Sequence, residues 1–470
     1  MSDSKMSARE RIELLLEENS FVELGSYVSA RNTDYNLGAK KVEGDGVITG
    51  YGVLGDRMVY VYSQDASMLG GSMGEMHARK ISAVYDMAMK TGAPVIGMID
   101  CAGLRLQEAG DALAAFGSIF YKQVQASGKI PQIAAVCGMC GGGSSVMTSM
   151  SDFTFMTREG SALFVNSPNT LEGNIESKQN TASASYQAET AGNVDFLCED
   201  EQDMIQKIRT LVAFLPSDYE ADDAFMECED DLNRVIEELN DSVYDAGYLL
   251  SSIADGHGFM ETKADYAGEM KTGFLRLNGM TVGAVANAQP VLTAEGLKKA
   301  GRFVRFCDAF SIPVLTVTDV EGMKATLEEE KDLAGAMAEF TAELAAANVA
   351  KVNLIVGKAF GTAGVVMNSK SIGADFVLAW PQAAIGMMDA SQAVRIIYSD
   401  EIAENPDKPT LIREKTAEYQ ELQSNALAAA KRGYVDDIIT PDATRKRLIA
   451  AYEMLFGKKQ ESPEKKHTAI

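Results

Sequence analysis

The feature that most constrains this chain is an internal repeat, because blocks of its first half recur in the same order in its second half. Residues 53–64 match 276–287, and both read as a hairpin turn that leads into a buried strand. Residues 93–103 match 312–322, since each has a proline, an apolar run, an aspartate and then a glycine. An amphipathic helical pattern precedes residues 93–103, and another precedes residues 312–322.

A glycine-rich block completes the repeat. Residues 133–147 match 353–367, in an alignment that pairs Gly141 with Gly361. In both halves an Asp-Phe pair then opens the next predicted strand. Matching blocks in one order predict two copies of a single α/β unit.

The repeat divides the chain into two predicted domains, 1–240 and 241–470. The acidic stretch 216–241 has the composition of a linker between them. The chain has 43 basic and 67 acidic residues, a net charge of −24, which argues against a nucleic-acid partner. No stretch reaches about 18 uninterrupted apolar residues, and the N-terminus has no apolar signal core. We therefore expect a cytoplasmic protein with reduced cysteines.

The first glycine-rich block also contains Cys137 and Cys140 at C-x-x-C spacing, which raises a redox pair and a zinc site as alternatives. The second half has Gly357 and Phe360 at the aligned positions, so sulfur is not what the two halves share. Zinc would need a second ligand pair, and the other cysteines are isolated in the sequence. We interpret the segment as a turn and expect no metal site.

A glycine-rich turn between a strand and a helix leaves backbone N–H groups unpaired, and such groups bind a phosphate or an oxyanion. The order G-x-x-x-x-G-K-[ST] is absent, and no G-x-G-x-x-G follows a predicted strand. The chain has three histidines, so catalysis by histidine is disfavoured. Two interpretations stay open: an oxyanion hole in each half, or a turn that only packs a helix against a sheet.

Three longer segments carry a family resemblance. Residues 44–81, 301–320 and 432–454 resemble the carboxyltransferase β subunits of biotin-dependent acyl-CoA carboxylases and the related α subunits of acyl-CoA decarboxylases. The resemblance implies two tandem crotonase-like domains, each a ββα superhelix. It also implies that the first domain holds acyl-CoA, that the second holds biotin, and that domains of different subunits share an active site.

The resemblance assigns roles to both glycine-rich turns. The N–H groups of Gly142 and Gly143 are expected to hold the thioester enolate, and those of Thr362 and Ala363 the ureido oxygen of biotin. The other residues expected around biotin are Gly322, Gly361, Gly364 and Val365. The residues expected to bind the acyl-CoA substrate are Gly70, Gly71, Gly103, Arg105 and Gly141. Proton transfer would then occur between substrate and cofactor, which accounts for the shortage of histidine.

The implied reaction moves a carboxyl group between carboxybiotin and a short-chain acyl-CoA. Biotin attaches at an A-M-K-M motif; the nearest match, "AMKT" at 88–91, reads as the end of a helix. Biotin is therefore expected on a partner, a biotin carboxyl carrier protein. The other implied partners are a biotin carboxylase or a membrane decarboxylase subunit, and further copies of this chain in a hexamer built as a dimer of trimers.

Segments 166–185 and 319–332 depart from the usual sequences of these subunits. Two alternatives therefore stand beside a carboxylase component. One is the decarboxylating subunit of a sodium pump, and the other is a non-catalytic assembly subunit that keeps the fold.

Overall fold

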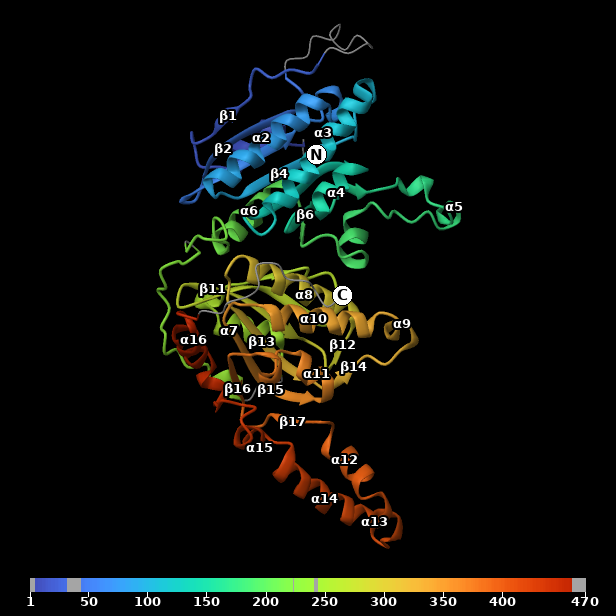
Figure 1. The fold of residues 1–470 in the computed structure, drawn as a ribbon, viewed down its shortest axis with the longest axis vertical. Coiled ribbons are helices and arrows are strands. Elements are labelled where there is room, and N and C mark those ends of the chain that lie inside the picture. The colour runs from blue at the N-terminus through green and yellow to red at the C-terminus, as the bar shows by residue number, and fades with distance from the viewer. Residues whose placement is uncertain (1–4, 32–43, 223, 241–243, 459–470) are drawn as a thin grey trace. The chain divides into compact units, whose positions relative to one another are not determined.

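The structure is a computed structural model that describes residues 5–31, 44–222, 224–240 and 244–458. The chain divides into two compact units, Met1–Ala224 and Phe225–Ile470. Each unit is built on its own eight-stranded sheet, and helices cover the faces of both sheets (Figure 1). The chain is therefore an α/β protein with mixed sheets.

The first sheet has the strand order β1-β2-β3-β4-β5-β6-β8, with β7 paired to β5. Its strands are β1 (Val22–Leu24), β2 (Val47–Leu54), β3 (Arg57–Gln64), β4 (Val95–Cys101), β5 (Gln132–Gly141), β6 (Phe153–Thr157), β7 (Ala162–Phe164) and β8 (Phe196–Cys198). The hairpin β2–β3 is antiparallel, and the strands from β3 onward run parallel. The buried, apolar β4 is typical of a strand in a parallel sheet.

The second sheet has the order β18-β16-β15-β13-β11-β10-β9, with β17 paired to β15. Its strands are β9 (Phe259–Thr262), β10 (Met270–Leu277), β11 (Met280–Asn287), β13 (Val314–Val320), β15 (Lys351–Phe360), β16 (Phe376–Ala379), β17 (Ala384–Gly386) and β18 (Asp437–Ile438). Read in chain order, each strand occupies the place of its counterpart in the first sheet. The break in register between β4 and β5, at Ile99 and Cys101, recurs between β13 and β15 at Thr318 and Val320.

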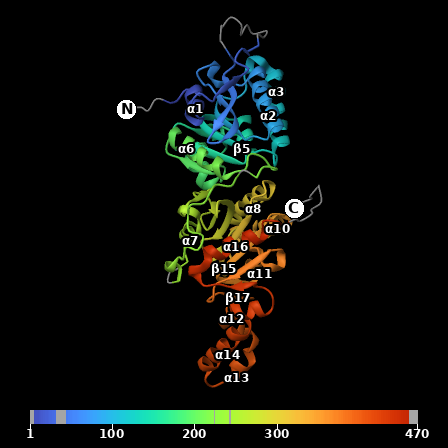
Figure 2. The ribbon, with the colours of Figure 1, turned by 90° about the vertical axis from the view of Figure 1, so that its left-hand side faces the viewer.

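Helices lie on both faces of the first sheet. Figure 2 shows α2 (Glu75–Thr91) and α3 (Ala109–Ala126) on one side of it and α1 (Ala8–Leu15) and α6 (Glu201–Phe214) on the other. Of the apolar stripe predicted for α2, Ile81, Val84, Tyr85 and Ala88 are buried and Met89 is half-buried. Helix α1 begins with a capping box in which Ser7 and Glu10 each bind the other's backbone N–H.

The second unit repeats this arrangement. Helices α8 (Ala294–Ala309) and α10 (Leu333–Ala346) pack together, and α7 (Ala246–Ile253) and α16 (Thr444–Leu455) contact β10. The stripe predicted on α8 is buried: Leu297, Ala300, Val304 and Cys307. A two-stranded sheet of β12 (Val291–Leu292) and β14 (Gly322–Met323) and the short α9 (Leu327–Glu330) complete this side.

The two units differ most in the segment before their last strand. Between β7 and β8 lie the short helix α5 (Asn174–Ser177) and a single π-helical turn, Tyr186–Thr190. Between β17 and β18 lie four helices: α12 (Ala390–Ile397), α13 (Ser399–Glu404), α14 (Lys408–Gln423) and α15 (Ala426–Lys431). Residues 387–423, here called the arm, project from the sheet of the second unit (Figure 1). Neither α13 nor α14 has a buried residue.

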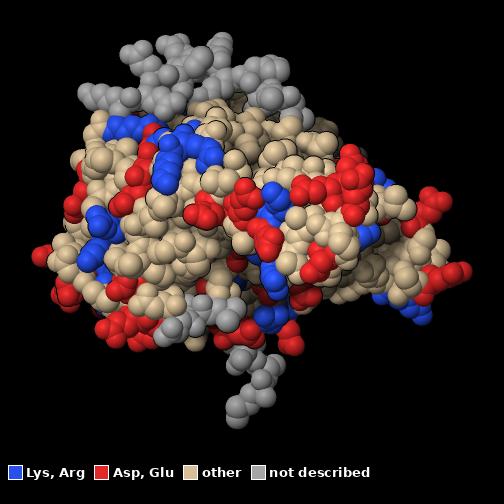
Figure 3. Space-filling model, turned by 90° about the horizontal axis from the view of Figure 1, so that it is seen from below, with Lys and Arg blue, Asp and Glu red and all other residues tan. Residues whose placement is uncertain are grey.

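Charges of both signs share the face of the molecule in Figure 3, where basic side chains occur in small groups among acidic ones. In the ranges that the structure describes, no helix is both long enough and apolar enough to cross a membrane.

Candidate active site

Each unit has a sharp turn at the end of its central strand. In the first unit β5 ends at Gly141, Gly142 has a φ of 60°, and α4 (Gly143–Ser149) begins immediately. In the second unit β15 ends at Phe360, Gly361 has a φ of 56°, and α11 (Gly361–Val366) follows. A positive φ favours glycine, which accounts for a glycine at both turns.

This geometry corrects the sequence alignment by one residue. The strand ends make Gly142, rather than Gly141, the counterpart of Gly361. The first half has three glycines in a row, so either alignment matches glycine with glycine in the sequence. The counterparts of Cys137 and Cys140 become Val356 and Ala359, which again contain no sulfur.

The backbone N–H groups at the two turns differ in availability. The N–H of Gly142, predicted as an oxyanion donor, instead donates to the Phe164 carbonyl of β7 at 2.9 Å. Within the described residues, no partner is found for the N–H groups of Gly143, Thr362 or Ala363. In this structure the first turn therefore has one unpaired donor, Gly143, while both predicted donors of the second turn are unpaired, and the role of these groups toward an oxyanion stays a prediction.

The residues predicted around the second turn differ in how closely other atoms surround them. A Cβ atom at Gly322 would meet nothing within 4 Å, and the Val365 side chain is 41% exposed. A Cβ atom at Gly361 would lie 3.1 Å from the carbonyl oxygen of Met387. Gly364 is packed against the backbone of Ala359, so a side chain at this position would collide with the end of β15.

The glycines predicted to bind acyl-CoA meet at the end of β4. Gly70 and Gly71 form one turn, Leu69–Gly71, and a Cβ at Gly71 would lie 2.5 Å from the Asp100 carbonyl. The Gly103 carbonyl accepts the N–H of Met73 at 2.8 Å. Two loops distant in sequence are thereby held side by side.

Arg105 does not offer its charge to a ligand. The residue is 2% exposed, and its guanidinium lies 2.5 Å from Asp45 Oδ1 and 2.7 Å from Glu108 Oε1. It also donates to the Ser72 carbonyl at 2.6 Å. Burial raises the pKa of Asp45, and Arg105 opposes that shift. The ion pairs and the hydrogen bond of Arg105 hold the loop at Ser72, and its expected contact with substrate stays a prediction.

The C-x-x-C pair belongs to strand β5 and not to the turn, which corrects our interpretation. Cys137 and Cys140 are 3% and 0% exposed, and burial raises the pKa of each thiol to about 12. Protonated, enclosed thiols are poor nucleophiles and poor metal ligands. Across the described part of the chain, no group of three or more His, Cys, Asp or Glu side chains could hold a metal ion.

Two aspartates contact the central strands, and the sequence analysis gave them no role. Asp100 Oδ1 accepts the Met139 N–H at 3.2 Å, and Asp319 Oδ1 accepts the Lys358 N–H at 2.7 Å. Both aspartates belong to the repeated pattern of proline, apolar run, aspartate and glycine. Their recurrence ahead of Gly138 and Gly357 was the signal that could have identified them.

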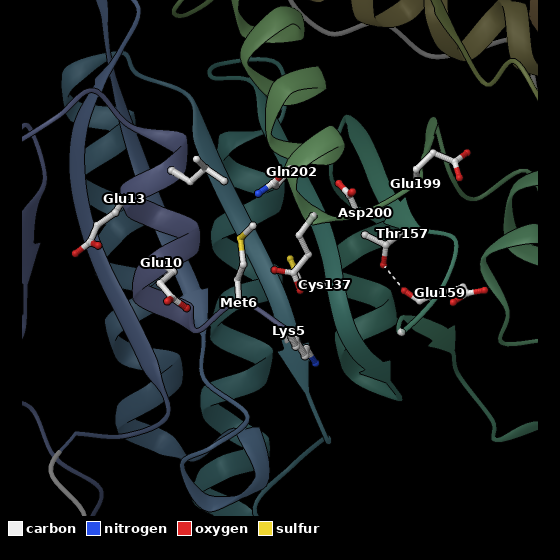
Figure 4. A pocket seen from close by; sticks show the side chains of 13 residues that line it. Lys5, Met6, Glu10, Glu13, Cys137, Thr157, Glu159, Glu199, Asp200 and Gln202 are labelled. Atoms are coloured by element: carbon white, nitrogen blue, oxygen red, sulfur yellow. Dashed lines mark hydrogen bonds between the residues drawn. The ribbon is translucent and has the colours of Figure 1, made fainter. Parts of the chain in front are cut away.

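A pocket of about 1110 Å³ lies on the first unit between α1, β5 and the start of α6 (Figure 4). Its side chains include one ammonium, Lys5, and the carboxylates of Glu10, Glu13, Glu159, Glu199, Asp200 and Glu201. A carboxylate-lined pocket repels the phosphates of a CoA ester. None of the predicted site residues lines it.

Known proteins are similar to this chain over its whole length. A family model, the carboxyl transferase domain, matches residues 1–470. The methylmalonyl-CoA decarboxylase subunit alpha of Propionigenium modestum is 38% identical over 484 residues, which cover 100% of this chain and 94% of that protein. The propionyl-CoA carboxylase beta chain of Roseobacter denitrificans is 39% identical over 482 residues, which cover 99% of this chain and 94% of that protein.

A solved structure is similar in fold as well. Transcarboxylase 12S, whose crystal structure concerns hexamer assembly and has methylmalonyl-coenzyme A and methylmalonic acid bound, matches with a TM-score of 0.95 and 34% identity. The match covers 99% of this chain and 92% of that one. Two sheets of one topology, free N–H groups at matched turns and these similarities agree: the chain belongs to the carboxyl transferase domain family.

Proposed function

We propose that this carboxyltransferase moves a carboxyl group between carboxybiotin on a carrier protein and a short-chain acyl-CoA of the propionyl and methylmalonyl class. The observation that carries the proposal is the pair of matched turns, with a free backbone N–H at Gly143 in one and at Thr362 and Ala363 in the other, in a chain of this family. Preorganised N–H donors stabilise an oxygen that becomes negative during reaction, typically by about 3–4 kcal/mol per donor.

The two units take different substrates in this proposal. Gly143 donates to the thioester oxygen of acyl-CoA as it becomes an enolate, and the loops at Gly71 and Gly103 hold the CoA ester. Biotin supplies the ureido nitrogen that carries the carboxyl group. Thr362 and Ala363 donate to the ureido oxygen, and the open space at Gly322 fits the biotin ring. The chain contributes position and electrostatics, as expected where substrate and cofactor exchange the proton.

The architecture is interpreted as a gene duplication of a crotonase-like ββα superhelix. The shared strand order, the shared break in register and the shared positive φ at the turns support this interpretation. The proposed domains are 1–240 and 241–470, and the compact units meet nearby, between Ala224 and Phe225.

The proposed assembly is a hexamer, a dimer of trimers, that works in the cytoplasm with a biotin carboxyl carrier protein. The arm supports a homo-oligomer, because its Met387 and Ile396 side chains are 77% and 66% exposed. Transcarboxylase 12S, the relative with a TM-score of 0.95, is described as a hexamer.

A second candidate function is the decarboxylating subunit of a sodium-pumping decarboxylase, which the 38% identity to a methylmalonyl-CoA decarboxylase subunit favours. Both candidates share the chemistry at the turns and differ in their partners. Affinity isolation from native cells separates them, since a biotin carboxylase supports the first and a membrane decarboxylase subunit the second.

The test of the shared chemistry uses purified protein, free biotin and either malonyl-CoA or methylmalonyl-CoA. We expect slow decarboxylation that depends on biotin, measured as the appearance of acetyl-CoA or propionyl-CoA. A Gly143→Val variant is expected to abolish it, because even a Cβ at Gly143 would lie 2.8 Å from the Phe116 ring. Binding of CoA esters without turnover of any of them would refute the proposal and favour a non-catalytic assembly subunit.

A further inference from the structure

We propose that Asp100 and Asp319 are positioning residues, each of which fixes the bend of the strand that leads into a reactive turn. The inference rests on the proposed function for its catalytic consequence. Its structural basis is independent, because the same arrangement of three residues occurs in each unit.

The first part of the arrangement is a hydrogen bond from the central strand to the aspartate. The Met139 N–H donates to Asp100 Oδ1 at 3.2 Å, and the Lys358 N–H donates to Asp319 Oδ1 at 2.7 Å. In both units this bond falls where the two strands lose register, so the carboxylate takes the place of a missing ladder partner. Each donor lies three residues before the glycine of positive φ.

The second part is a glycine that makes room for the carboxylate. A Cβ atom at Gly138 would overlap Asp100 Oδ1, and a Cβ atom at Gly357 would overlap Asp319 Oδ1. Neither Gly138 nor Gly357 has a positive φ. Glycine is needed at these positions because the aspartate side chain approaches the backbone closely. Glycine and aspartate therefore form a matched pair in each unit.

The third part is an amide side chain that holds the aspartate's own backbone. The Asp100 N–H donates to Gln64 Oε1 at 3.1 Å, and the Asp319 N–H donates to Asn287 Oδ1 at 2.9 Å. Gln64 and Asn287 are the last residues of β3 and β11. Three neighbouring strands are thus tied at one level, immediately before the turn.

The consequence for catalysis follows from distance. A displacement of about 1 Å at a reactive group can lower a rate roughly a hundredfold. Removing the carboxylate frees the strand segment three residues from the turn without touching any group that binds substrate. The expected signature is a loss of kcat with little change in the KM for the CoA ester.

The kinetic test compares Asp319→Ala with Asp319→Asn, which keeps an acceptor oxygen, in the assay of free biotin with malonyl-CoA. We expect Asp319→Ala to lower kcat by at least about tenfold at near-constant KM, and Asp319→Asn to recover most of the loss. The same comparison applies to Asp100. Asp332→Ala is the matched control, because its side chain is 67% exposed. Equal losses in the Ala and Asn variants would overturn the inference.

A second test examines the glycine. Gly138→Ala is expected to lower activity in the natural chain, but far less in an Asp100→Ala background, where no carboxylate is left to overlap and the Lys5 ammonium, which the Cβ would also meet, ends a 46% exposed side chain that can move away. Gly117→Ala serves as control, since its Cβ would meet nothing within 4 Å. Additive effects of the Gly138 and Asp100 substitutions would contradict the pairing.

Hydrogen exchange tests the inference even if the proposed function fails. We expect Asp100→Ala to accelerate amide exchange in peptides covering 137–143, and Asp319→Ala in those covering 356–362, by about tenfold or more. Exchange in β10 and β11 is expected to stay unchanged. Unaltered exchange at the turns would refute the positioning role, whereas absent turnover with altered exchange would refute only the proposed function.

Discussion

The two units hold their turns with the same backbone geometry but surround it with different charges. In the first unit Asp100 lies 2.5 Å from the Lys5 ammonium and 3.7 Å from the Arg11 guanidinium, both contributed by α1 or the residues before it. In the second unit the corresponding helix, α7, has the sequence AGYLLSSI, with no basic residue. Lys358 there pairs with Glu321 instead. The hydrogen bonds at the bend are common to both units, while charge compensation is specific to each.

The largest expected effect removes that compensation. Arg11 is buried and donates to both carboxylate oxygens of Glu201, at 2.8 and 3.0 Å. Arg11→Met leaves the buried Asp100 and the half-buried Glu201 without it, so we expect the first unit to lose about 3 kcal/mol of stability. Calorimetric unfolding measures this loss. Arg209→Met is the control, because its pair with Glu17 lies at the surface, where an ion pair contributes little to stability.

If Arg11→Met and Arg209→Met destabilise the protein equally, the charges of α1 are not what distinguishes the first unit.

The next effect concerns the second turn alone. Thr362→Pro removes one N–H donor, and proline suits the first turn of a helix. We expect kcat to fall by roughly 10²–10³-fold, the usual cost of losing one oxyanion donor. Thr362→Ala keeps the N–H and should retain near-normal activity. Equal losses in both variants would show that the threonine side chain, rather than its N–H, matters.

A smaller effect depends on pH and is confined to the first unit. His77 is fully buried on α2, and burial lowers its pKa to about 3. The unfolded chain binds this proton below about pH 6.5 while the folded chain does not, so stability falls by about 1.4 kcal/mol per pH unit between those limits. At pH 5 the loss is about 2 kcal/mol.

The buried lysines Lys80 on α2 and Lys299 on α8 occupy matching positions in the two units. Three residues before them stand His77 and Gly296, so Gly296 is the counterpart of His77. We therefore expect His77→Gln to flatten the pH dependence of unfolding between pH 7 and 5, as followed by denaturant titration at each pH. An unchanged slope would mean that His77 binds its proton equally well in the folded and unfolded chains, with no lowered pKa.

The smallest expected effect concerns Cys137 and Cys140, whose counterparts in the second unit, Val356 and Ala359, are not cysteines. Because burial raises the pKa of Cys137 and Cys140 to about 12, both thiols stay protonated at pH 8. Iodoacetamide should leave them unlabelled in the native protein and label them after denaturation, as mass spectrometry of peptides will show. The Cys137→Ala and Cys140→Ala variants should keep near-normal activity. Native labelling that inactivates the enzyme would restore the redox interpretation.

Much of the fold could be predicted from the sequence because each repeated block carries a local pattern, either an apolar run or helical spacing of apolar residues. The blocks at 93–103 and 312–322 predicted two buried parallel strands, and both are present as β4 and β13. The alignment at Gly141 and Gly361 was wrong by one residue, because a run of glycines has no side chains with which to set the register. Strand pairing resolves it, since the strands end at Gly141 and Phe360.

What the sequence could not reveal at the site is long-range pairing. The partner of Arg105, Asp45, is sixty residues away in sequence, and no local pattern reveals the pair. The Gly142 N–H is bonded to the Phe164 carbonyl of the neighbouring strand β7, a pairing that the sequence pattern also does not show. Conversely, Asp100 and Asp319 were visible in the repeat, and only the contacts with Gly138 and Gly357 show what the repeat preserves.

The arm has a consequence for the life of the subunit before it assembles. Helices α13 and α14 bury no residue, so little within the subunit opposes their local unfolding. We therefore expect a protease added to the unassembled subunit to cut first within residues 387–423.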